Sequence, residues 1–167
     1  MIKIKRNKTI IEAKSYKDLF DNNKDFSHQT FKNRNIRNVT ITKNVNLDFS
    51  NFYGCKLINT SFWSYIRGIV FQNSILQNVY FCGGFGNGIK FYNCTLTNVD
   101  LTTLNITYLE NCTLINSKFN PIKLLTTVDW GEIKSKTLCT DLMNFDAANH
   151  PKPELFKKWA KGGKCPY

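Results

Sequence analysis

The sequence predicts an all-β solenoid, in which the chain winds into a coil with four sides and stacks about five such coils. Three observations lead to this prediction. Similar segments recur about every twenty residues, as the match between residues 93–99 and 111–117 illustrates. Within each segment, large apolar residues recur about every five residues, with asparagine or glycine between them. Neither a helical period nor a simple meander reproduces this spacing.

The large apolar residues align in columns when the chain is read in steps of about twenty residues. The three clear columns are Phe31, Phe52, Phe71, Phe91 and Leu109; Ile36, Leu57, Leu76, Leu96 and Leu114; and Ile41, Phe62, Phe81, Leu101 and Phe119. A weaker fourth column, Phe26, Leu47 and Ile66, fails at Gly86. A smaller residue precedes most of the large ones by two positions, and residues two apart on an extended chain point to the same side. Each short strand therefore buries one small and one large side chain.

Asparagine and glycine form two further columns, which predict the corners of the coil. They are Asn38, Asn59, Asn78, Asn98 and Asn116; and Asn33, Gly54, Asn73, Asn93 and Asn111. Asparagine and glycine tolerate the left-handed backbone conformation that a sharp corner needs. Stacked asparagine side chains can also bond to one another along the column.

The chain resembles the pentapeptide-repeat proteins, whose unit is a small residue, Asn or Asp, Leu or Phe, a small polar residue and a variable one. The triplets Ser50-Asn51-Phe52, Val99-Asp100-Leu101 and Ser117-Lys118-Phe119 carry the resemblance. It covers residues 24–125, although the residue before the large one usually departs from Asn or Asp. The resemblance implies a right-handed, quadrilateral parallel β-helix with the large residues packed inward.

Segments outside the repeat predict a cap at each end, because a solenoid must cover its open ends. In the N-terminal cap, residues 1–23, we expect a strand over Ile2–Glu12 and a short helix over Ser15–Phe20, capped by Ser15. In the C-terminal cap, residues 126–167, the apolar spacing predicts α-helices over Lys136–Ala148 and Glu154–Ala160.

The net charge of +11 is concentrated near the N-terminus, where residues 1–46 hold eleven Lys and Arg against four acids. Seven of these residues are candidates for contact with nucleic acid or an acidic partner: Lys3, Lys5, Arg6, Lys8, Lys32, Arg34 and Arg37. The alternative is that these charges only keep an exposed edge soluble. The chain has no long apolar run and no signal-peptide pattern, so we expect a cytoplasmic protein without membrane contact.

Aromatic residues at outward positions are the candidates for binding a protein. They are Tyr53, Trp63, Tyr80 and Tyr92, together with Phe85 in the glycine cluster of residues 83–88, for which we expect a bulged corner or a protruding loop. Packing of these aromatics against the end caps is the alternative. The cluster lacks the Lys-Ser/Thr and the helix of a phosphate-binding loop.

Catalysis and cofactor binding are not expected. Cys139, His150 and Cys165 are the only weak candidates for zinc, and they lack paired ligand spacing. His28 and His150 are the two histidines, and neither belongs to a nucleophile motif. The inward cysteines of the repeat fill space as reduced thiols.

Three functions remain open. The first is a non-enzymatic scaffold of phage or mobile-element type that binds and modulates a host or bacterial protein, such as a defence factor or a topoisomerase. The resemblance implies binding to DNA gyrase, but imitation of DNA by acidic faces is disfavoured because residues 47–106 contain only Asp48 and Asp100 as acids. The second is binding of nucleic acid or an acidic partner through the basic ends. The third is a structural role in an assembly, including a homodimer through the ends.

Overall fold

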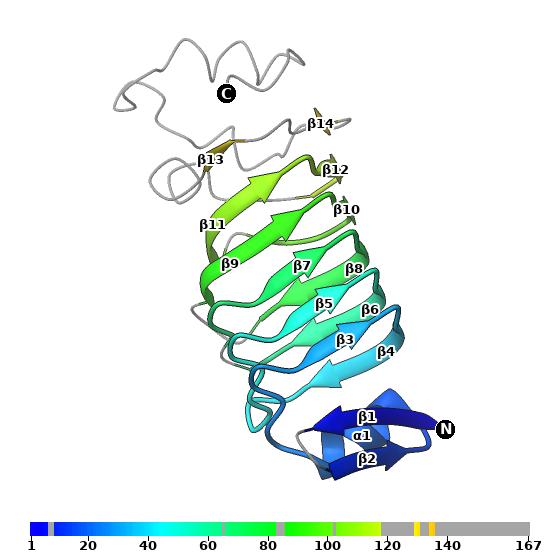
Figure 1. The fold of residues 1–167 in the computed structure, drawn as a ribbon. Coiled ribbons are helices and arrows are strands. Elements are labelled where there is room, and N and C mark those ends of the chain that lie inside the picture. The colour runs from blue at the N-terminus through cyan, green and yellow to red at the C-terminus, as the bar shows by residue number, and fades with distance from the viewer. Residues whose placement is uncertain are drawn as a thin grey trace, which may run out of the picture.

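The computed structural model describes residues 1–6, 9–64, 66–82, 86–101 and 103–117, and the backbone of 129–130 and 134–135. These residues form a β-solenoid of about four turns with a cap at its N-terminal end (Figure 1). The predicted solenoid is therefore confirmed, with about four turns where about five coils were expected. Residues 118–125, where we expected the repeat to end, lie outside the described residues.

Two six-stranded sheets run along the coil, and all their described pairings are parallel. The first sheet consists of β3 (Thr30–Lys32), β5 (Asn51–Tyr53), β7 (Val70–Gln72), β9 (Gly86–Tyr92), β11 (Leu104–Glu110) and β13 (Asp129–Trp130). The second consists of β4 (Asn35–Ile41), β6 (Lys56–Phe62), β8 (Ile75–Phe81), β10 (Thr95–Thr97), β12 (Thr113–Ile115) and β14 (Lys134–Ser135). Successive strands of the chain alternate between the sheets, so each pair of strands forms one rung.

The register of the sheets confirms the columns of large residues. Phe52 pairs with Phe31 and Phe71, and Leu57 pairs with Ile36 and Leu76. Every described member of the three clear columns is at most 4% exposed. Identical rings therefore stack along the axis: the Phe31, Phe52, Phe71 and Phe91 centroids follow one another at 4.7, 5.1 and 5.0 Å. This stack is the centre of the core.

The asparagine columns form corners, as predicted. All their members have φ between 49° and 53°, and Gly54 has φ of 62°. Side-chain amides bond along one column, with Asn59 donating to Asn38 at 3.0 Å and Asn78 donating to Asn59 at 2.9 Å. The long strands β4, β6 and β8 bend at this column, and their last three residues form a third side of the coil, which we call the third side.

A third corner column, not predicted from the sequence, separates the fourth side from the first sheet. Its members are His28, Phe49, Gly68 and Gly88, all with positive φ. The fourth side carries the weak apolar column, and Leu104 resumes this column after Gly86. A Cβ atom on Gly86 would lie 2.7 Å from Leu104 Cδ2, so neighbouring side chains already fill the space that Gly86 leaves.

The glycine cluster is partly a strand rather than a loop. Gly86 and Asn87 of β9 pair with Leu104 and Asn105 of β11, and Gly88 is skipped in the register as a bulge with φ of 71°. Of the two expectations for the cluster, the bulged corner is confirmed at Gly88, and the protruding loop is wrong for Gly86 and Asn87. Residues 83–85, including the candidate Phe85, lie outside the described residues.

The N-terminal cap contains the predicted short helix and one strand more than expected. β1 (Ile2–Arg6) and β2 (Thr9–Ala13) pair antiparallel, and α1 (Tyr16–Asn22) follows. Ser15 caps α1 as predicted, because its Oγ accepts a hydrogen bond from Asp18 N at 3.0 Å. The Phe20 ring of α1 lies 5.2 Å from that of Phe26 and thereby closes the end of the core.

The backbone of β13 and β14 adds one more rung to both sheets within the segment assigned to the C-terminal cap. The helices predicted for this segment lie outside the described residues, as do the weak zinc candidates Cys139, His150 and Cys165.

Candidate protein-interaction surface

The predicted aromatic residues are divided between two sides of the coil. Tyr53 and Tyr92 lie in the first sheet, in one outward column with Gln72 between them. The side chain of Tyr53 is 36% exposed, and Lys32 Nζ lies 5.8 Å from its ring centroid. Two rungs separate the tyrosines, or about 10 Å at the usual strand spacing. They are therefore not one contiguous patch.

Trp63 and Tyr80 come together on the third side. Ser61 of β6 pairs with Tyr80 of β8, and Trp63 follows Ser61 by two residues. The ladder continues past β6, because Trp63 N donates to Ile41 O and Cys82 N donates to Phe62 O, both at 2.8 Å. Trp63 and Tyr80 are thus diagonal neighbours on adjoining rungs, about 8 Å apart by strand geometry.

Both rings are exposed to solvent although both are large. Trp63 is 52% exposed and Tyr80 is 49% exposed. The outward residues Ser61, Trp63, Tyr80 and Cys82 are called the Trp63–Tyr80 surface below. Packing of these aromatics against the end caps stays the alternative prediction, because most of the C-terminal cap lies outside the described residues.

Buried phenylalanine rings on the inner side of the same strands support this surface. Phe62 and Phe81 alternate with the outward residues, and their rings stack at 5.0 Å. Both also contact Phe71 edge to face, at 6.3 and 6.2 Å. The strand backbones that carry Trp63 and Tyr80 are therefore fixed before any partner arrives.

No basic residue lies at the described outward positions of the third side, despite the net charge of +11. These positions are Thr40, Thr42, Ser61, Trp63, Tyr80, Cys82 and Asp100. The surface is thus aromatic and polar, with Asp100 at one border.

The thiols of the described residues have no feature that would activate an accessible nucleophile. Partial burial, together with Asp100, raises the pKa of Cys82, and burial raises the pKa of Cys55. A hydrogen bond with Cys112 lowers the pKa of Cys94, but Cys94 is only 2% exposed. Within the described part of the chain, no three His, Cys, Asp or Glu side chains gather to hold a metal ion.

The described members of the predicted basic site lie on the N-terminal cap and on the first rung, and Arg34 connects the two. Lys3 pairs with Glu12 at 2.6 Å, and Arg37 donates to Asn35 Oδ1 at 2.7 Å. Arg34 is half-buried and joins the cap to the coil, because its Nη2 donates to Lys3 O at 2.9 Å. Lys5 is exposed on the cap, and Lys32 lies on the first sheet. The side chain of Arg6 and the whole of Lys8 lie outside the described residues.

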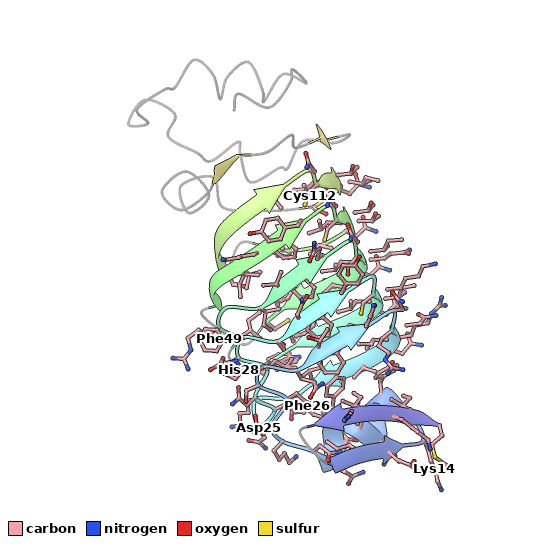
Figure 2. The ribbon with its side chains drawn as sticks, viewed as in Figure 1. Lys14, Asp25, Phe26, His28, Phe49 and Cys112 are labelled. Carbon is pink, nitrogen blue, oxygen red and sulfur yellow. The ribbon has the colours of Figure 1, made fainter. Side chains whose placement is uncertain are left out.

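An exposed aromatic corner was missed in the sequence. Phe49 is 48% exposed at φ of 57°, and its ring stacks on His28 at 5.1 Å (Figure 2). The guanidinium carbon of Arg67 lies over the Phe49 ring, 5.4 Å from its centroid, and Arg67 forms an ion pair with Asp48 at 2.7 Å. The recurrence of Gly68 and Gly88 about twenty residues apart was the only sequence signal for this corner.

No protein-family model matches the chain, and no curated protein matches it. Among the described residues, no helix has the length and apolar character needed to cross a membrane. The fold and the surface geometry are therefore the basis for the functional proposal.

Proposed function

We propose that this chain is a non-catalytic interaction scaffold that binds a protein partner through the Trp63–Tyr80 surface. One observation carries the proposal: two half-exposed aromatic side chains are held as neighbours on a rigid side of the coil. Trp and Tyr are the residues that most often anchor protein interfaces.

The exposure of Trp63 and Tyr80 and the fixed strands beneath them both favour binding. Burying the exposed parts of Trp63 and Tyr80 removes apolar area from water, at about 25 cal/mol per Å². Little ordering entropy opposes this gain, because stacked core rings already fix the two strands. The tyrosine hydroxyl and the indole N–H add directional contacts at the border of such an interface.

The character of the surface favours a protein rather than a nucleic acid. Nucleic-acid binding depends on Lys and Arg that neutralise phosphates, and the described outward positions of the third side have neither. We propose a host or bacterial protein as the partner, with a defence factor and a topoisomerase as the first classes to test. Contact with a topoisomerase would use aromatic packing, because Asp48 and Asp100 are the only acids between residues 47 and 106.

The test is affinity capture with matched variants. Tagged wild-type chain, Trp63→Ala, Tyr80→Ala and the control Tyr53→Ala are mixed with nuclease-treated bacterial lysate at moderate salt. The captured protein is then purified, and its dissociation constant is measured with each variant. We expect Trp63→Ala and Tyr80→Ala each to weaken binding about 30-fold or more, equivalent to about 2 kcal/mol.

The control shows whether a loss of binding is specific to the Trp63–Tyr80 surface or follows from any exposed aromatic residue of the coil. Tyr53→Ala removes a tyrosine from the first sheet and should change affinity by less than about threefold. Equal losses in all three variants would contradict the proposed surface. Recovery that depends on intact nucleic acid would replace the proposal with the basic-end hypothesis.

A further inference from the structure

The N-terminal hairpin has one protected edge and one open edge. β1 and β2 form a sheet of only two strands, so each strand has one edge without a strand partner in the described chain. On β1, side chains of the first rung cover this edge: Gln29 Nε2 donates to Lys5 O at 3.0 Å, and Arg34 Nη2 donates to Lys3 O at 2.9 Å.

These two hydrogen bonds also show which backbone groups of β2 point away from β1. In an antiparallel pair, residues directly opposite each other point their N–H and C=O groups either both inward or both outward. Lys3 lies opposite Glu12, and Lys5 lies opposite Ile10. Because the Lys3 and Lys5 carbonyls point away from β2, the N–H and C=O groups of Ile10 and Glu12 point away from β1.

The open strand has little of the usual protection of an edge, since its one charged side chain, Glu12, is paired with Lys3 of β1. Natural edge strands are blocked by Lys, Pro, bulges or covering segments. β2 reads Thr-Ile-Ile-Glu-Ala and contains neither Lys nor Pro, whereas β1 carries Lys3, Lys5 and Arg6. Basic residues therefore lie on the strand whose edge is already covered.

We propose that β2 pairs antiparallel with β2 of a second copy of this chain, which would make a four-stranded sheet across a two-fold axis. With Ile11 opposite Ile11 of the second copy, the outward groups of Ile10 meet those of Glu12 on the other chain. No like charges are then directly opposed along the new ladder. Ile11 is only partly buried beside the core and gains cover from its counterpart.

The small size of this interface and the net charge of each copy determine how the dimer should depend on concentration and salt. Pairing of two five-residue strands buries well under ~1,200 Å², so the dimer is weak and concentration-dependent. Each copy carries a net charge of +11, so the copies repel each other at low ionic strength. Salt shortens the screening length from ~10 Å at 0.1 M to ~3 Å at 1 M and should strengthen the dimer. The Trp63–Tyr80 surface is not involved.

The experiment is sedimentation equilibrium of the full chain from about 1 µM to about 1 mM, at two salt concentrations. Ile10→Pro removes an outward N–H without removing a bond between β1 and β2, and we expect it to abolish the dimer. The control Lys5→Pro makes the same change on the covered edge opposite Ile10. It also removes one positive charge, so its electrostatic effect can only favour association, and the dimer should persist.

A second readout uses the unmodified chain and does not depend on the folding of any variant. Amide hydrogen exchange at Ile10 and Glu12 should slow at least about tenfold between dilute and concentrated samples, while exchange at Lys3 and Lys5 stays constant. A monomer at every concentration would overturn the proposal. So would a dimer that survives Ile10→Pro, or concentration-independent exchange, because association would then be absent or located elsewhere.

Discussion

Replacing Phe71 with alanine should lower the free energy of unfolding by about 3–5 kcal/mol, the usual range for a buried phenylalanine. Phe71 is 0% exposed, and its ring stacks between those of Phe52 and Phe91 at 5.1 and 5.0 Å. Phe62 and Phe81 contact it edge to face from the third side. The resulting cavity lies between two rungs of fixed backbone, so the surroundings cannot collapse to fill it.

Urea unfolding of the wild-type chain and the variant measures this loss, with Gln72→Ala as the control. Gln72 is the next residue of β7 and points outward, so its replacement should change the free energy of unfolding by less than about 0.5 kcal/mol. The stacked core would be contradicted if Phe71→Ala were no more destabilising than Gln72→Ala.

The second large effect is expected at a corner, where Asn78→Ala should destabilise the chain by about 2–4 kcal/mol. Asn78 has φ of 51°, a conformation that alanine adopts only at a cost of about 1–2 kcal/mol. Its side chain also donates to Asn59 at 2.9 Å and accepts from Asn98 at 3.0 Å. Each of these inter-rung hydrogen bonds contributes roughly 1 kcal/mol.

Asn78→Gly separates the two contributions, because glycine tolerates the corner but cannot make the hydrogen bonds. We expect Asn78→Gly to be less destabilising than Asn78→Ala by about 1 kcal/mol, measured by thermal and urea unfolding. If the glycine variant were as unstable as the alanine variant, the corner backbone would not be the source of the effect.

The coil was predictable because its signals recur at a fixed spacing in the sequence. One turn of the coil takes about twenty residues, so Phe52 and Phe71, one repeat apart in the sequence, are neighbours in space. The corner at His28 and Phe49 escaped prediction because phenylalanine seldom adopts positive φ, so the two positions did not form a column of one turn-forming residue type. Only the ring stack between them reveals why the pair occupies this corner.

The N-terminal hairpin escaped prediction for a different reason. Ile2 and Ile4, and then Ile10 and Ile11, fit one loose strand as well as two, and no glycine marks a turn between them. The number of strands in the cap depends on packing against the core, and the local sequence pattern carries no information on that packing. Arg34 illustrates the same limit, because its bond to Lys3 O arises only when the cap docks on the coil.

The candidate surface was half predictable. The alternation along each strand indicates that Trp63, Tyr80, Tyr53 and Tyr92 face outward. It does not indicate which of them are neighbours, because the register slips between Phe62 and Phe71. Their grouping follows from the pairing of Ser61 with Tyr80, which brings Trp63 close to Tyr80 and separates both from Tyr53.

The most direct test of the proposed surface is site-specific photocross-linking in bacterial cells. A photoreactive phenylalanine derivative is placed at position 63 in one variant and at position 53 in another, and the adducts are identified by mass spectrometry. We expect one protein partner to be cross-linked efficiently from position 63 and little or none from position 53. Adducts from position 53 alone, or the same scattered adducts from both positions, would contradict it.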